Sequence, residues 1–153
     1  MLRIAMGVFV AVAFAARGGA AEMNPREVTE AYLAAALTGK PADAAKLAVE
    51  GQSPSREKTA EGMKSFLGVE KLPVAKVLAS DAKGRAIAVS GRVKVKDSDG
   101  TEVSGCVCLS LTKTADGWRV KDIDFTSEET AALRLAEFSE KYDDAKEIPA
   151  AKK

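Results

Sequence analysis

Two aspartates and one tyrosine form the candidate set for acid–base chemistry in this chain. The sequence contains no histidine, which excludes an imidazole base, a Ser-His-Asp or Cys-His nucleophile system and an ordinary zinc or copper site. In the strand register derived below, Asp122 and Asp124 face an apolar interior. Desolvation there would raise a carboxyl pKa and make either residue a candidate general base, with Tyr32 as its hydroxyl partner.

A β-bulge near Lys121 is the other interpretation of the same stretch. The bulge would turn Ile123 and Phe125 inward and send both aspartates to solvent. We favour the bulge, because bulges are common and an unpaired buried carboxylate is costly. No catalytic residue is expected if the bulge is present.

Cys106 and Cys108 are two residues apart on a predicted strand, so their side chains point the same way. Their Cα atoms should lie about 6.5–7 Å apart, at the edge of disulfide reach. The pair could join two subunits, bind a soft metal, or act as thiols whose pKa is lowered by Arg92 and Lys121 on the neighbouring strands. Two cysteines on a strand are more often small buried hydrophobic residues, and we expect no metal site and no cofactor.

Basic and small residues on the same sheet face as the cysteines form a candidate ligand or partner face. An anionic ligand or a protein could bind there, although such residues usually belong to a solvated sheet face. The members of this face are Ser90, Arg92, Cys106, Cys108, Arg119 and Lys121.

A curved four-stranded antiparallel meander between Pro73 and Phe125 must position these side chains. Four runs of β-forming residues are separated by three polar turns, which end at Gly84, Gly100 and Gly117. Matching apolar residues across the strands sets the register, because residues directly opposite each other share a face. The resulting pairs are Val95–Val103, Val93–Gly105, Val89–Leu109, Ile87–Leu111, Leu111–Trp118 and Leu109–Val120.

This register divides the sheet into an apolar inner face and an outer face of small residues. The predicted inner face consists of Ile87, Val89, Val93, Val95, Val103, Val107, Leu109, Leu111, Trp118 and Val120. The centre of the outer face consists of Ala86, Ala88, Ser90, Cys106, Cys108 and Ser110. Small side chains let a second layer approach closely, so we expect a second subunit or the last helix to cover this face.

Helices precede and follow the meander, which makes the fold class α+β. The capping residues Asn24 and Pro25 begin a first helix that ends at Gly39. Further helices are predicted over Pro41–Val49 and from Ser53 to Gly68, and a final helix begins after Ser127. We expect one domain over residues 22–142, followed by a disordered charged tail over residues 143–153.

The N-terminus has the three parts of a secretory signal peptide. A basic start is followed by an apolar run from Ile4 to Ala16 and then by small residues. We expect cleavage near Ala21, export to the periplasm or medium, and no membrane attachment afterwards. The 23 basic and 22 acidic residues give a formal net charge of +1, which does not favour a nucleic-acid partner.

The capped helix, the segment Gly39–Leu47 and a meander that finishes in Asp116–Val120 resemble the nuclear transport factor 2-like superfamily, and within it small exported bacterial domains such as the lumazine-binding-like group. The resemblance covers roughly residues 24 to 125 and implies helices within a curved sheet, forming a cone with a pocket. Enzymes of this superfamily commonly place Asp, His and Tyr in the pocket. The resemblance and the missing histidine predict a non-enzymatic domain that binds a small molecule or a protein and could form a homodimer through its sheet. A small isomerase- or dehydratase-like enzyme with an aspartate base is the alternative.

Overall fold

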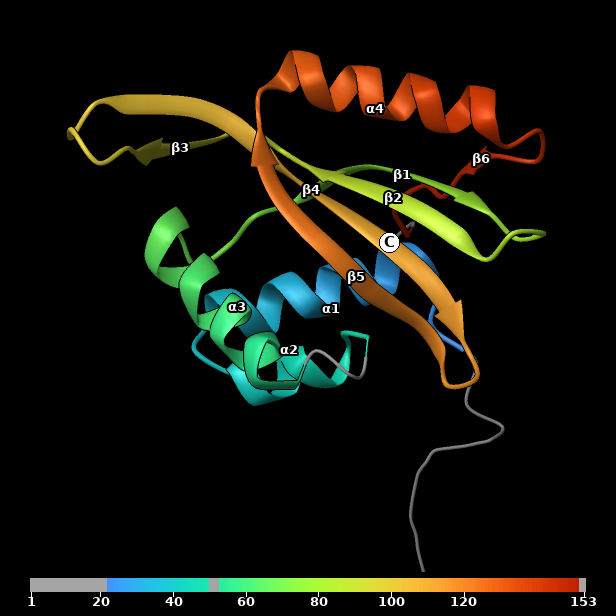
Figure 1. Cartoon of the computed structure of the whole chain (residues 1–153), viewed down its shortest axis with the longest axis horizontal. Helices are drawn as coiled ribbons and strands as arrows, with labels where there is room; N and C mark the ends of the chain where they lie inside the picture. The colour runs from blue at the N-terminus through green and yellow to red at the C-terminus, as the bar shows by residue number, and fades with distance from the viewer. Residues whose placement is uncertain (1–21, 50–52, 152–153) are drawn as a thin grey trace, which may run out of the picture.

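The computed structural model describes residues 22–49 and 53–151, without the side chains of residues 53–55 (Figure 1). The predicted signal peptide therefore lies outside the described residues. The elements are α1 (Pro25–Leu37), α2 (Pro41–Lys46), α3 (Ser53–Leu67), β1 (Val74–Ser80), β2 (Arg85–Ser90), β3 (Val93–Lys96), β4 (Glu102–Thr114), β5 (Gly117–Thr126), α4 (Glu128–Lys141) and β6 (Lys146–Glu147). The expected α+β class is confirmed. In the part of the chain that the structure describes, no helix is long and apolar enough to cross a membrane.

Local sequence signals begin and end α1 as expected. The Asn24 side chain accepts a hydrogen bond from the Glu27 backbone N–H at 2.9 Å, and the Glu27 carboxylate accepts one from the Asn24 N–H at 2.9 Å. Two otherwise free donors at the helix start are thereby satisfied. Gly39 follows the helix with φ 79°, a backbone conformation that glycine adopts without strain.

The second helix is shorter than predicted, because the chain after Lys46 pairs with the sheet instead of continuing as helix. The Val120 N–H donates to the Leu47 carbonyl at 2.8 Å, and the Val49 N–H donates to the Val120 carbonyl at 2.9 Å. These bonds fix α2 beside β5.

The sheet is the predicted meander with one strand interrupted and one short strand added. Strand β1 pairs with β2, β2 and β3 both pair with the same edge of β4, and β5 pairs with the other edge of β4. The predicted second strand is thus interrupted after Ser90, and the short β6 adds to β1. All the pairs are antiparallel.

The predicted register of the second strand was right for β3 and wrong by one residue for β2. Val93 pairs with Gly105 as predicted, but Ala88, not Val89, lies opposite Leu109. The Ser90 hydroxyl accepts a hydrogen bond from the Val107 N–H at 2.8 Å, which takes the place of a ladder carbonyl and accommodates the extra residue.

This shift exchanges the two faces of β2. Ala86 and Ala88 join the main core, whereas Ile87 and Val89 belong to the outer face. The prediction of Ile87 and Val89 on the inner face was therefore wrong. The prediction placed the larger apolar side chains, Ile87 and Val89, on the inner face, but Ala86 and Ala88 are the residues that belong to the inner core.

A second bulge, at Lys121, confirms the favoured interpretation of β5. Val120 pairs with Leu111 and Asp122 pairs with Ser110, which leaves Lys121 without an opposite residue. Ile123 and Phe125 consequently pack against the core.

Three further details of the predicted register and inner face were wrong. Trp118 lies opposite Lys113 and not Leu111, and Leu109 lies opposite Ile123 and not Val120. The turn between Thr114 and Gly117 displaces both pairs by two residues from the predicted register, and the bulge at Lys121 displaces the pair of Leu109 by one more. Val103, near the turn after β3, is 39% exposed and does not belong to the core.

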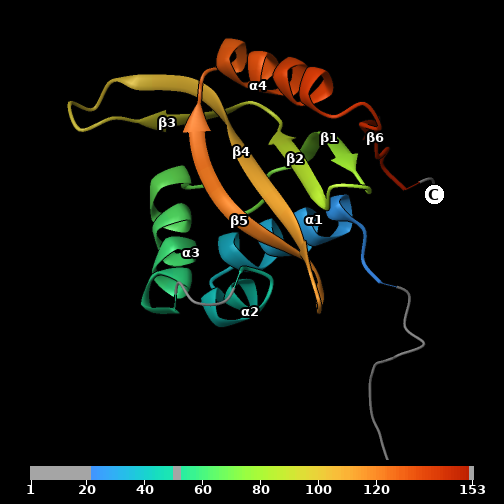
Figure 2. The same cartoon turned by 45° about the vertical axis from the view of Figure 1, so that its right-hand side comes forward.

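The sheet separates two layers of helices. Helices α1, α2 and α3 lie against its concave inner face, and α4 lies on the opposite face (Figures 1 and 2). The largest side chains of the inner core are almost completely buried; they include Tyr32, Leu33, Leu37, Leu109 and Leu111.

The tail after α4 is ordered, so the prediction of disorder from residue 143 was wrong for residues 143–151. The Ile148 N–H donates to the Val77 carbonyl at 2.9 Å, and the Arg26 Nε donates to the Ile148 carbonyl at 2.8 Å. The Ile148 side chain also packs against the core. The Ile148 contact, these hydrogen bonds, the pairing of β6 with β1 and the bonds that the Asp144 carboxylate accepts from Ser80 and Ala82 together hold this segment.

Candidate functional site

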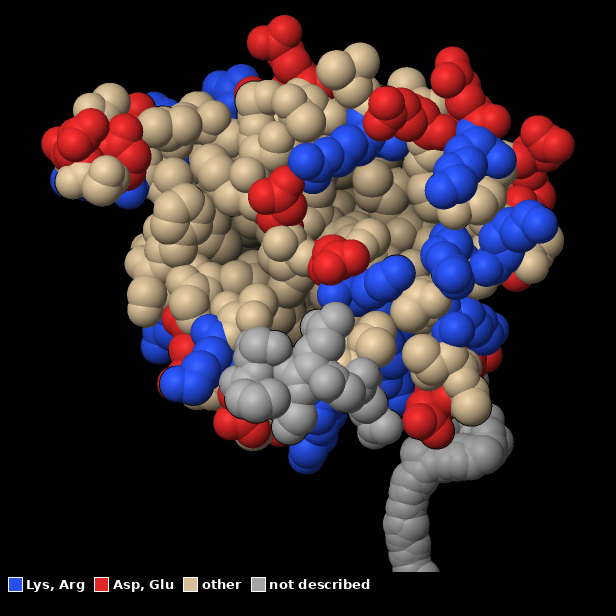
Figure 3. All heavy atoms as spheres, in the orientation of Figure 1, with Lys and Arg blue, Asp and Glu red and all other residues tan. Residues whose placement is uncertain are grey.

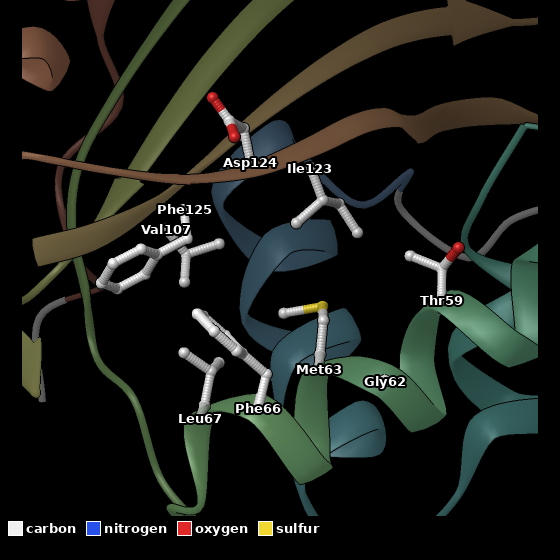
Figure 4. Close-up of a pocket in the computed structure, with 9 residues that line it drawn as sticks. All are labelled: Thr59, Gly62, Met63, Phe66, Leu67, Val107, Ile123, Asp124 and Phe125. Carbon is white, nitrogen blue, oxygen red and sulfur yellow. The ribbon is translucent and has the colours of Figure 1, made fainter. Parts of the chain in front are cut away.

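An apolar cavity of about 220 Å³ opens between α3 and β5. Figure 4 shows Met63, Phe66 and Leu67 of α3 facing Ile123 and Phe125 of β5 across it. The bulge at Lys121 is what turns the two β5 residues toward α3. The other residues lining the cavity are Thr59, Gly62, Val107 and Asp124.

The mouth of this cavity exposes an aromatic ring. Phe66 is 48% exposed, and its ring meets that of Phe125 edge-on with centroids 5.3 Å apart. Figure 3 shows this part of the surface as a hollow of uncharged residues with charged side chains around it. Gly62 contributes no side chain, and a Cβ added there would meet no atom within 4 Å. The glycine helps to keep the hollow open.

A smaller and more polar cavity of about 190 Å³ adjoins the apolar one and shares Thr59 and Ile123 with it. Arg56 lines it, and its Nη1 donates to the carbonyls of Ala45 at 3.0 Å and Ala48 at 3.4 Å. These two bonds hold the guanidinium at the C-terminal end of α2. The Arg56 Nε is buried and has no hydrogen-bond partner among the described residues.

The other polar residues that line this smaller cavity are Tyr32, Thr59, Lys121 and Asp122. Burial raises the pKa of the Tyr32 phenol to about 12, so the phenol stays protonated and able to donate at neutral pH. Lys121 is exposed. The polar end of the site is thus richer in donors than in acceptors.

The two aspartates considered for catalysis are both exposed. The Asp122 carboxylate accepts a hydrogen bond from the Ser110 hydroxyl at 3.3 Å, and the Asp124 carboxylate lies 2.8 Å from the Arg134 guanidinium. In Figure 4 the Asp124 carboxylate points away from the apolar cavity. The enzymatic alternative requires a desolvated carboxylate in the cavity beside Tyr32, and neither aspartate is in that environment.

Cys106 and Cys108 are buried beside Val89 and pack against Ala131 and Leu135 of α4. Burial raises the pKa of both thiols, and for Cys108 the nearby Arg134 guanidinium partly opposes this shift. The pair therefore behaves as small buried side chains and not as activated thiols.

Lys121, predicted opposite Cys108, is not its neighbour: the register of β5 places Asp124 there, and Val89 of β2 lies on the other side. Arg92 and Cys106 do line one cavity. No group of three or more side chains that could hold a metal ion occurs in the described part of the chain.

Helix α4 divides the predicted ligand face. Ser90, Arg92 and Cys106 line a cavity of about 230 Å³ near the start of α4, where Arg92 pairs with Glu128 at 3.0 Å. Lys121 lines a separate cavity of about 300 Å³ near the other end of the helix. Cys108 lies beneath the helix, and Arg119 donates to the Trp118 carbonyl at 2.8 Å. Of the two expected covers for this face, the last helix is present. Pairing of two copies through the sheet stays a prediction.

The polar cavity is the part of the site that sequence reasoning missed. Arg56 was not singled out, because a single arginine on a predicted helix gives no signal of its own. The bonds to Ala45 and Ala48 depend on how α2 and α3 pack. Pro41, at the first position of α2, could have indicated where that helix starts but not which side chain meets its end.

No family model and no curated protein matches the chain. Among solved structures, a SEC-C motif containing protein from Rhodopseudomonas palustris is similar, at 12% identity and a TM-score of 0.48 over 67% of this chain and 79% of that one. A putative hydroxylase from Streptomyces galilaeus matches at 14% identity and 0.46, over 82% and 87% of the two chains. A putative calcium/calmodulin dependent protein kinase II association domain from Xanthomonas campestris matches at 17% sequence identity and a TM-score of 0.41. The match covers 71% of this chain and 90% of that one.

These likenesses are too distant to carry an argument about function. The order and packing of the chain's own elements do establish its architecture: three N-terminal helices lie within a curved antiparallel sheet and a fourth lies on its back. This is the arrangement that the resemblance of the sequence to the nuclear transport factor 2-like superfamily implies.

Proposed function

We propose that the chain is a non-enzymatic binding domain whose site is the cavity between α3 and β5. The observation that supports this proposal is a cavity lined mainly by carbon and open to solvent at Phe66, with no desolvated carboxylate in it. Sites for small molecules are typically concave and mostly apolar, with a few polar groups that fix orientation. A cavity of about 220 Å³ exceeds the roughly 150 Å³ of apolar cavities that bind benzene.

Methionine methyl NMR tests this proposal directly. Of the described methionines, Met63 lines the cavity and Met23 lies outside it, before α1. With methyl-labelled methionine, titration with 1-hexanol should shift the Met63 signal saturably and leave the Met23 signal in place. Equal shifts of both signals, or none at Met63, would contradict the proposal.

Two variants of Gly62 provide the matched control. Gly62→Leu should fill the cavity and weaken hexanol binding at least tenfold. Gly62→Ala raises the helix propensity about as much as Gly62→Leu does but adds only one carbon atom. It should bind hexanol nearly as tightly as the parent chain does. Equal loss in both would mean that helix rigidity, and not cavity space, controls binding.

We also propose that the domain acts after export, which the tripartite N-terminus supports. The intact mass of the protein purified from its native envelope or medium tests this. Loss of the segment up to about Ala21 is expected, and a retained Met1–Ala21 segment would contradict the proposal.

A further inference from the structure

The apolar and polar cavities adjoin along one line of the fold. Thr59 of α3 and Ile123 of β5 line both, so these two side chains lie between a molecule in the apolar part and the polar part. The two parts differ in chemistry. Phe66, Met63 and Phe125 surround the first, whereas Arg56 and Lys121 line the second.

Arg56 is the residue whose contacts are incomplete. Its Nη1 is fixed by the Ala45 and Ala48 carbonyls, but its Nε is buried without an acceptor among the described residues. Buried donors are nearly always paired, and leaving one unpaired is unfavourable. The Nε is itself shielded from solvent, so it is the rest of the guanidinium, as part of the cavity lining, that an anion in the cavity would meet.

Charge indicates what kind of acceptor this is. No salt bridge of Arg56 or Lys121 is found among the described residues, although both line the cavity. The acidic residue there, Asp122, accepts a hydrogen bond from Ser110, its strand partner across the ladder. The bulge leaves Lys121 opposite no residue of β4, and bulges commonly re-aim a side chain next to a site.

We propose that the site takes a ligand with an apolar body and one anionic head, such as a carboxylate, and that Arg56 and Lys121 bind the head. The apolar body lies between Phe66, Met63 and Phe125. This inference rests on the proposed function and adds the ligand class to it. Arginine suits such a head because its planar fork matches a carboxylate and cannot lose its charge.

Hexanoate and 1-hexanol form a matched pair of probes that differ in the head group alone. On the full chain, followed by the Met63 methyl signal, hexanoate should bind about tenfold more tightly than hexanol, since a hydrogen bond to a charged group is worth about one factor of ten. Arg56→Gln should remove this preference, because it weakens hexanoate binding much more than hexanol binding. Lys121→Gln should reduce the preference less, and Lys96→Gln, on β3 and in the lining of neither cavity, should not change it.

The outcomes separate the two proposals. Equal affinity of the parent chain for both probes would overturn the inference about the head group and leave the proposed apolar site standing. No binding of either probe would overturn the proposed function itself. Arg56→Gln also removes bonds to α2, so its melting temperature is measured alongside. If that variant unfolds, the comparison of the two probes on the parent chain and on Lys121→Gln still decides.

Discussion

The two faces of the sheet are covered in different ways. The inner face packs on three helices through side chains such as Leu33 and Leu109, which are at most 2% exposed. The outer face is covered by α4, in which Ala131 is the buried residue. Exposed ion pairs, Arg92–Glu128 and Arg134–Asp124, join α4 to the sheet. The comparison indicates that the packing of the inner helices contributes most of the free energy of unfolding and that the packing of α4 contributes less.

The largest expected effect tests this difference with one substitution on each face. Leu109→Ala, on the inner face, should lower the free energy of unfolding by about 3 kcal/mol, because it removes a fully buried side chain and leaves a cavity. Leu135→Ala, on half-buried α4, should cost about 1 kcal/mol. Urea denaturation followed by circular dichroism measures both. Equal losses would mean that α4 is packed as firmly as the inner helices.

A glycine on the inner face offers the next largest effect. A Cβ at Gly105 would lie 2.5 Å from the Thr126 carbonyl oxygen and 2.7 Å from the Phe125 ring. Gly105→Ala should therefore destabilise the fold by about 2 kcal/mol, since the neighbouring strand has to move. Gly62→Ala is the control: it has open space around it and should stabilise α3 by about 0.5–1 kcal/mol. A neutral Gly105→Ala would show that β4 and β5 are less tightly coupled than their packing indicates.

Sequence patterns predicted the elements better than they predicted the faces. Caps and glycine-ended turns are local, and Asn24, Gly84 and Ser127 lie where they were expected to act. The register of β3 against β4 also followed from pattern, because the intervening turn is short.

The errors arose where a non-local contact decides. The Ser90 hydroxyl replaces a backbone partner for Val107 and so moves β2 by one residue. One slip of this kind exchanges the two faces of a strand, which is why Ile87 and Val89 were misplaced. The tail was missed because Ile148 is one apolar residue in a charged segment. The polar part of the candidate site was missed because Arg56 reaches α2 only in the folded chain.

The buried phenol of Tyr32, on α1, leads to a prediction about how stability depends on pH. The pKa of Tyr32 rises from 10.0 to about 12 on burial, so the folded state keeps its proton where the unfolded state loses it. The stability that this proton contributes is fully present below pH 10 and is lost as the pH rises to about 12. Tyr32→Phe should lose less stability over that range than the parent chain, as measured by urea titrations at each pH. Identical slopes in the two chains would mean that the phenol is hydrated in the folded state.

The smallest expected effect belongs to the outer face. Arg134 and Asp124 are 2.8 Å apart, but their side chains are 38% and 53% exposed. Water and side-chain entropy reduce the value of such a pair, so Asp124→Asn should cost less than about 1 kcal/mol. The cost should shrink further in 1 M salt, where charges are screened within about 3 Å. Arg134→Gln should show the same small loss, and the double variant should lose no more than either single one. A loss of more than about 2 kcal/mol in any of them would mean that this pair, and not the contact of Ala131 and Leu135 with the cysteines, holds α4 on the sheet.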